Sequence, residues 1–136
     1  MPTEADRRRD KRLDLMLPVQ FVADPQAAMA LCSGVTHNVS SSGVYFEAVA
    51  AQLAAEDSLL VRIGVPARSD ENKPNLTLVG TGVVRRVDSL TPDQARGSWP
   101  ELQRQKGIYG IAVQFEQRPT IQLRSFEELL WEGHPH

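Results

Sequence analysis

The 136-residue sequence lacks most features of secreted, membrane-spanning and metal-binding proteins. Its single cysteine, Cys32, excludes an internal disulfide framework, and it has no companion ligands at the spacing of a zinc site. No apolar run approaches the roughly 20 residues of a membrane-spanning helix, and residues 1–12 are too polar for a signal peptide. We therefore expect a cytoplasmic protein that holds no metal and does not insert into a membrane.

Motifs of common enzyme families are also missing. The sequence contains no G-x-S-x-G, H-E-x-x-H, P-loop or G-x-G-x-x-G pattern. Of its three histidines, His134 and His136 lie in the polar C-terminal tail, and His37 alternates with valines in a strand-like segment. We therefore expect no catalytic residues, no cofactor and no enzymatic activity.

Charge is distributed unevenly along the chain, although its formal sum is only −2. Residues 1–12 contain five basic and three acidic groups, which leaves ten basic and fourteen acidic groups in the rest of the chain. The first twelve residues also show no apolar periodicity. They are therefore predicted to form a flexible basic arm in front of an acidic body.

Short segments with strand patterns make up most of the body. Alternation places Leu15, Leu17, Val19 and Phe21 on one face of the first segment, and it places Val35 and Val39 on the inner face of the second. The predicted strands cover residues 15–22, 34–40, 43–46, 58–65, 76–88 and 109–115.

Two further segments complete the expected architecture. Residues 89–107 form a polar connection in which we expect a helical turn. Residues 120–132 place Leu123, Phe126 and Leu130 at the spacing of a short amphipathic helix. Helical patterns between the strands are missing, which argues against a parallel α/β fold. We predict a mainly β protein: an arm (1–12), a six-stranded antiparallel β-barrel (13–118), and a C-terminal α-helix and tail (119–136).

The stretch NVSSSG is unusually polar for a turn between two predicted strands. Asn38 and Ser40 are two residues apart, so their side chains leave the same outward face. Ser41 and Ser42 add hydroxyl groups, and Gly43 lacks the Cβ that would keep another molecule from the backbone. These residue types are common in ordinary turns, but together they also make a polar recognition patch.

Arg8 and Arg12 on the arm supply the complementary chemistry. A guanidinium group binds phosphate through two hydrogen bonds, donates to the O6 and N7 atoms of guanine, and stacks on a base. Two such groups facing a polar turn would suit a compact anionic nucleotide.

These residues resemble the two signatures of the PilZ domain, the bacterial receptor module for cyclic di-GMP. R-x-x-x-R matches Arg8 to Arg12, and [D/N]-x-S-x-x-G matches Asn38 to Gly43. The resemblance continues through GTGVVRRV and YGIAVQFE, and so covers roughly residues 7–117. Ala112 departs from the glycine that the family often has there, and we expect this change to affect packing more than binding.

The resemblance implies a set of ligand-binding residues. Arg8 and Arg12 would wrap around cyclic di-GMP and contact its phosphates and guanines. Asn38 and Ser40 would hydrogen-bond the ligand from the strand end, and Gly43 would shape the turn.

Five further residues are candidates for the same site. Arg7 directly precedes the first signature, and in the family an arginine there accompanies binding of a stacked ligand dimer. Ser41 and Ser42 are additional candidates. Arg85 and Arg86 are neighbours on one predicted strand, so we expect them to point to opposite faces and at most one to reach the ligand.

The expected function is that of a receptor that changes its arm conformation on binding cyclic di-GMP and relays the signal to a protein partner. Leu129 and Trp131 of the predicted C-terminal helix are candidates for the partner surface. Two alternatives remain open: a PilZ-like protein adaptor that binds no nucleotide, and a barrel that binds single-stranded nucleic acid. The chain has only eight aromatic residues on which bases could stack, and its body is acidic; both features argue against binding of a long nucleic acid. The sequence does not distinguish among motility, exopolysaccharide, virulence and transcription as the regulated process.

Overall fold

The computed structural model describes residues 14–23, 32–49, 53–65 and 76–122. The predicted arm, with Arg7, Arg8 and Arg12, lies outside these ranges, and so does the part of the predicted C-terminal helix that follows residue 122.

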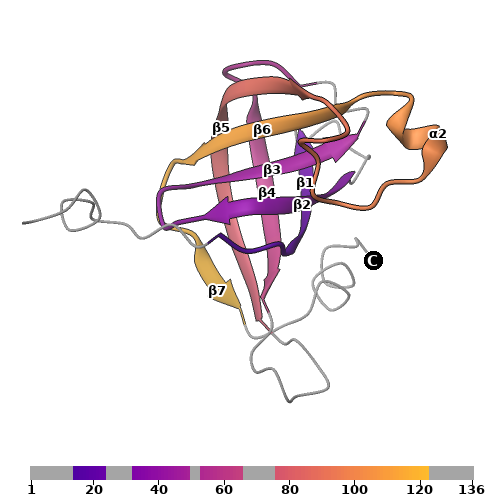
Figure 1. Ribbon diagram of the computed structural model, residues 1–136. Helices are drawn as coiled ribbons and strands as arrows, with labels where there is room; N and C mark the ends of the chain where they lie inside the picture. The colour runs from indigo at the N-terminus through magenta and orange to yellow at the C-terminus, as the bar shows by residue number, and fades with distance from the viewer. Residues whose placement is uncertain (1–13, 24–31, 50–52, 66–75, 123–136) are drawn as a thin grey trace, which may run out of the picture.

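The described residues form a closed antiparallel β-barrel (Figure 1). Neighbouring strands pair in the order β4-β1-β2-β3-β6-β5, and β4 also pairs with β5, which closes the barrel and confirms the predicted six-stranded fold. The elements are β1 (Pro18–Ala23), β2 (Cys32–Val39), β3 (Gly43–Val49), β4 (Ser58–Val65), β5 (Leu76–Leu90), α2 (Glu101–Arg104), β6 (Ile108–Phe115) and β7 (Thr120–Gln122).

The helical turn predicted in residues 89–107 is confirmed as α2. The connection that carries it leaves the end of β5 and projects from the side of the barrel before it returns as β6 (Figure 1). No helix within the described ranges is long and apolar enough to cross a membrane.

The length of β5 allows the barrel to close. Residues 76–83 of this 15-residue strand pair with β4, and residues 82–90 pair with β6. The edge that β6 leaves uncovered is taken by β7, which pairs with Thr77, Leu78 and Val79. Thr120 and Ile121, which sequence analysis placed at the start of a helix, are therefore in a strand. Their β-branched side chains suit that conformation.

The barrel interior is filled by the apolar residues that alternate along the strands. The buried rings of Phe21 and Phe46 pack against each other there, with their centroids 4.9 Å apart. Alternation predicted most of these positions correctly. The fully or almost fully buried apolar residues include Leu17, Val19, Phe21, Val39, Val44, Phe46, Leu59, Val61, Ile63, Val84, Ile111, Val113 and Phe115.

The lead-in to β1 breaks the predicted alternation. The N–H of Leu17 donates to Oγ1 of Thr36 at 2.8 Å, and the Thr36 hydroxyl donates to the carbonyl of Leu15 at 2.5 Å. These contacts with a fully buried threonine hold residues 15–17 out of the strand, which begins at Pro18. The prediction that Leu15 faces inward is wrong: its side chain is exposed.

A bulge in β2 causes the second departure. Thr36 pairs with Phe46 and Asn38 pairs with Tyr45, so His37 is an extra residue without a partner in the ladder. The bulge shifts the phase of the strand. Thr36 is therefore fully buried, and Val35, predicted to face inward, is only half-buried.

Phe46→Ala should lower the free energy of unfolding by about 3–5 kcal/mol, because it removes a fully buried ring from the barrel centre. Leu102→Ala, at an exposed position on α2, is the matched control and should change it by less than about 0.5 kcal/mol. Urea denaturation followed by circular dichroism measures both. Equal effects would contradict a core centred on Phe46.

Candidate functional site

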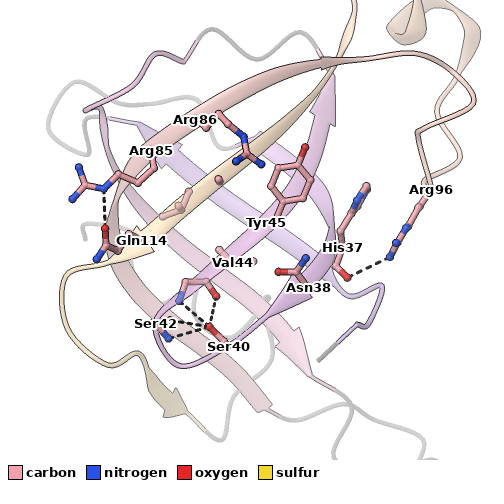
Figure 2. A pocket seen from close by; sticks show the side chains of 13 residues that line it. His37, Asn38, Ser40, Ser42, Val44, Tyr45, Arg85, Arg86, Arg96 and Gln114 are labelled. Carbon is pink, nitrogen blue, oxygen red and sulfur yellow. Dashed lines mark hydrogen bonds between the residues drawn. The ribbon is translucent and has the colours of Figure 1, made fainter. Parts of the chain in front are cut away.

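A row of side chains crosses the outer face of four neighbouring strands. Each member is paired with the next across the β2–β3, β3–β6 and β6–β5 ladders: Asn38, Tyr45, Ala112 and Arg86. The adjacent row points into the core and consists of Val39, Val44, Val113 and Val84. Burial of the valine row therefore fixes the outward direction of the first row, which lines a pocket (Figure 2).

A second bulge adds one more cation to this pocket. Val84 pairs with Val113 and Arg86 pairs with Ala112, so Arg85 is the extra residue in β5. Both arginines are exposed and both line the pocket. The expectation that they point to opposite faces is wrong, because strict alternation does not hold across a bulge.

The pocket has a volume of about 560 Å³, within the range of small-molecule sites. Of the NVSSSG turn, the lining includes Asn38, Ser40, Ser42 and Gly43, but not Ser41. The structure thus brings together four of the predicted turn residues and both predicted arginines of β5. Ala112 lies in the pocket and not in the core.

Ser40 holds the turn together. Its Oγ accepts hydrogen bonds from the N–H groups of Ser42 and Gly43, both at 3.2 Å, and its own N–H donates to the Gly43 carbonyl at 2.9 Å. A Cβ on Gly43 would lie 2.5 Å from the carbonyl oxygen of Val113, so β6 itself requires glycine here. Both motif residues therefore have a structural role that does not depend on a ligand.

Asn38 is the motif residue whose side chain is most available to a ligand. It is half-buried, lines the pocket, and makes no side-chain hydrogen bond with another described residue. Figure 2 shows its amide between the turn and the Tyr45 ring. An amide can both donate and accept hydrogen bonds, so Asn38 can bind either a base edge or a phosphate.

Tyr45 provides the aromatic surface of the site. Its ring meets His37 edge-on at 5.3 Å between centroids, and the Arg86 guanidinium carbon lies 5.7 Å from the ring centroid. The hydroxyl donates to Oδ2 of Asp88 at 3.1 Å. A Cβ on Gly110 would lie 1.9 Å from this hydroxyl oxygen, so glycine at this position makes room for the ring.

The Tyr45 hydroxyl remains protonated. Burial raises its pKa above the ordinary value of 10.0, and the hydrogen bond to Asp88 raises it further, against a smaller opposing effect of Arg86. The phenol is therefore a neutral hydrogen-bond donor at physiological pH.

Three arginines surround the pocket, and the side chains that accept their hydrogen bonds are exposed, except that of Asp88, which is half-buried. Arg85 donates to Gln114 at 2.8 Å and to Glu56 at 3.2 Å, and Arg86 donates to Asp88 at 3.0 Å. Arg96 donates to Asp14 at 2.8 Å. The exposed ion pairs of Arg85 and Arg96 contribute little free energy, so an anionic ligand can replace their acceptors.

Glu47 fixes the wall of the pocket that contains Arg96. Its Oε1 accepts from Nε2 of His37 at 2.5 Å and from the N–H of Arg96 at 2.8 Å. Its Oε2 accepts from the N–H of Gly97 at 2.8 Å and from Nε1 of Trp99 at 2.7 Å. One buried carboxylate thereby joins β3, the β2 bulge and the 91–107 connection.

These bonds decide the ionisation of Glu47. Burial by itself would raise the pKa, but the donors from Arg96, His37, Trp99 and Gly97 outweigh it and hold the pKa below the ordinary value of 4.5. Glu47 is therefore a carboxylate at physiological pH.

Several lining residues escaped the sequence analysis. Tyr45 and Gln114 occupy ordinary outward strand positions, and nothing in their local sequence marks them. Arg96 lies in the polar connection, 58 positions after Asn38, and only the contacts of Glu47 bring the two together. Within the described ranges, no three His, Cys, Asp or Glu side chains form a group that could hold a metal ion.

Comparison with known protein families identifies the chain. The model of the PilZ domain matches residues 6–130, which is most of its length. The chain belongs to the PilZ domain family. PilZ domains form a family of cyclic di-GMP receptors and effectors that are generally not enzymes.

The PilZ fold also appears in the comparison with solved structures. The chain is similar to the Bacillus subtilis inhibitor of motility MotI/DgrA, with a TM-score of 0.56 and 17% identity over 82% of this chain and 43% of that one. The chain thus spans less than half the length of that protein. At this identity the likeness concerns the fold. No curated protein matches the chain.

Glu47→Gln should destabilise the PilZ domain by about 1–3 kcal/mol at neutral pH, because an amide NH₂ would face the N–H donors of Gly97 and Trp99. Because the pKa of Glu47 is lower in the folded state than in the unfolded state, the ionised carboxylate stabilises the wild type above about pH 4.5. This stabilisation is lost as the pH falls through the folded-state pKa. The difference between wild type and variant should therefore narrow in acid. Urea denaturation across this pH range measures it.

Glu101→Gln is the matched control, because Glu101 is exposed and, among the described residues, its side chain pairs only with Arg104 one helical turn away. It should leave stability unchanged within about 0.5 kcal/mol. A Glu47→Gln effect that is equally large in acid and at neutral pH would show that the carboxylate charge is not what holds the connection.

Proposed function

We propose that this PilZ domain is a receptor for cyclic di-GMP and that the outer-face pocket is its binding site. The observation that carries the proposal is the pocket itself, in which the NVSSSG turn meets three guanidinium groups and an aromatic ring. Family membership supplies the ligand class.

The chemistry of the pocket matches the parts of cyclic di-GMP. The ligand carries two phosphate charges, and arginines such as Arg85 and Arg86 bind phosphate through charge-assisted hydrogen bonds. The amide of Asn38 offers a donor and an acceptor for a guanine edge. The ring of Tyr45 and the guanidinium of Arg86 offer stacking surfaces for a base, worth about 1–3 kcal/mol per base.

The length of the chain would allow the R-x-x-x-R arginines to reach this pocket. The described chain begins at Asp14, whose carboxylate contacts the pocket residue Arg96. A chain spans at most about 3.5 Å per residue. The Cα atom of Arg12 can therefore be no more than about 7 Å from that of Asp14, and the Cα atom of Arg8 no more than about 21 Å. We propose that both close over the ligand from the side opposite the turn.

Arg7 bears on the number of cyclic di-GMP molecules that bind to each protein. It precedes the R-x-x-x-R motif, and with Arg8 and Arg12 it would give the arm enough cations to neutralise a second dianion. We therefore propose that two stacked cyclic di-GMP molecules bind to each protein. Ser42, which lines the pocket, is proposed to contact the ligand, and Ser41, which does not, is proposed to contact it only at the rim.

The change in arm conformation that accompanies ligand binding would relay the signal. A basic segment that is recruited to the ligand changes the surface that is presented to a protein partner. We propose that residues 123–136, which include Leu129 and Trp131, form part of the partner surface; they lie outside the described residues.

Titration calorimetry should show micromolar or tighter binding of cyclic di-GMP to the wild type and a loss of at least about 100-fold in the Arg8→Ala/Arg12→Ala variant. Each arginine would otherwise contribute bonds to phosphate or guanine. The matched control is Arg104→Ala/Arg118→Ala, which removes two exposed arginines outside this pocket and should bind normally.

Two results would reject the proposal that this protein is a cyclic di-GMP receptor. A folded wild type that shows no binding would favour a protein adaptor. Affinity for single-stranded oligonucleotides that falls steeply with salt, together with weak binding of the dinucleotide, would indicate a nucleic-acid-binding barrel instead.

The stoichiometry of the same titration tests Arg7. We expect two cyclic di-GMP molecules per wild-type chain and one per Arg7→Ala chain, because the variant lacks a cation for the second ligand. Arg118→Ala serves as the charge-matched control and should retain two. A wild-type stoichiometry near one would reject the stacked dimer without affecting the receptor.

A further inference from the structure

The connection between β5 and β6 delivers a third arginine to the pocket. Residues 91–107 project from the barrel, but the N–H groups of Arg96 and Gly97 are bound by the buried carboxylate of Glu47. These two bonds fix the backbone at the base of the Arg96 side chain. Figure 2 shows that the side chain extends from the connection toward His37 at the edge of the pocket.

The contacts of Arg96 leave much of its guanidinium available. Nη1 donates to Oδ1 of Asp14 at 2.8 Å and to the carbonyl of His37 at 3.4 Å. Among the described residues these are the only side-chain hydrogen bonds that it makes. The N–H groups of Nε and Nη2 remain for a ligand, and the side chain is 43% exposed.

Asp14 is a weak partner for Arg96. Its side chain is 75% exposed, and a pair this open to water gains little free energy from its charges. A ligand phosphate could accept two parallel bonds from the same guanidinium, which is a stronger arrangement. Exchange of the Asp14 carboxylate for a phosphate oxygen is therefore favourable.

We infer that Arg96 is a ligand-binding residue outside both signatures and that Asp14 is its counter-ion until a phosphate of cyclic di-GMP takes its place. This inference rests on the proposed function. Glu47 acts as a positioning residue, because it holds the Arg96 backbone and does not itself line the pocket.

The exchange would couple the pocket to the arm. Asp14 lies two residues after Arg12, and its ion pair with Arg96 anchors the chain at this point to the pocket wall. A ligand that takes Arg96 releases Asp14, so this anchorage depends on occupancy of the pocket. By linkage, any change that weakens the Asp14 pair must favour the ligand.

Calorimetric titration of cyclic di-GMP into single and double variants tests this exchange. Arg96→Gln should bind about tenfold more weakly, because one guanidinium–phosphate contact is lost. Asp14→Asn should bind about two- to fivefold more tightly, because the competing carboxylate is gone. The Asp14→Asn/Arg96→Gln double variant should bind like Arg96→Gln alone.

Asp93→Asn is the matched control for charge. Asp93 is exposed on the same connection but does not line the pocket, so its loss should leave affinity unchanged. Far-UV circular dichroism of each variant verifies folding. Asp14 and Arg96 are both exposed, so neither substitution should disturb the barrel.

The double-variant cycle separates this inference from a general effect of charge. Tighter binding by Asp14→Asn that persists in the Arg96→Gln background would overturn it, and so would unchanged affinity of either single variant. In those cases binding by the wild type would leave the receptor proposal intact. A folded wild type that binds no cyclic di-GMP would remove both proposals.

Discussion

The buried carboxylate of Glu47 is the interaction on which the pocket depends most. A charge without water must be surrounded by donors, or the fold loses several kilocalories per mole. The chain meets this requirement with donors from two distant segments: His37 on β2, and the backbone and indole N–H groups of residues 96–99. Satisfying one acid therefore places a surface connection and its arginine beside strands that are remote in sequence.

Strand alternation with two interruptions builds the remainder of the site. The buried row of valines forces Asn38, Tyr45, Ala112 and Arg86 outward, in register across four strands. The bulges at His37 and Arg85 lie at the two ends of this row and add a residue to each. A barrel surface thus acquires a concave, cationic and partly aromatic site without any change in its core.

The NVSSSG turn serves the fold and the site together. Ser40 and Gly43 are required by the turn and by the close approach of β6, whereas Asn38 has its side chain uncommitted within the described structure. Their presence in the motif therefore has a physical reason that does not depend on a ligand. Gly110 also has a structural role beside the pocket, because its missing Cβ makes room for the Tyr45 ring.

The sequence by itself determined six of the strands, most of the inward residues and the motif residues, because a period of two and the chemistry of a turn are local properties. It could not place the bulges, since nothing local distinguishes His37 or Arg85 from a regular strand residue. It therefore misjudged Val35 and the directions of Arg85 and Arg86. Only the tertiary structure brought Arg96 and Asp14 together, because their contact depends on a buried carboxylate 49 residues before Arg96. Barrel closure and the hydrogen bonds of Glu47 are long-range constraints, and these decided which residues share the pocket.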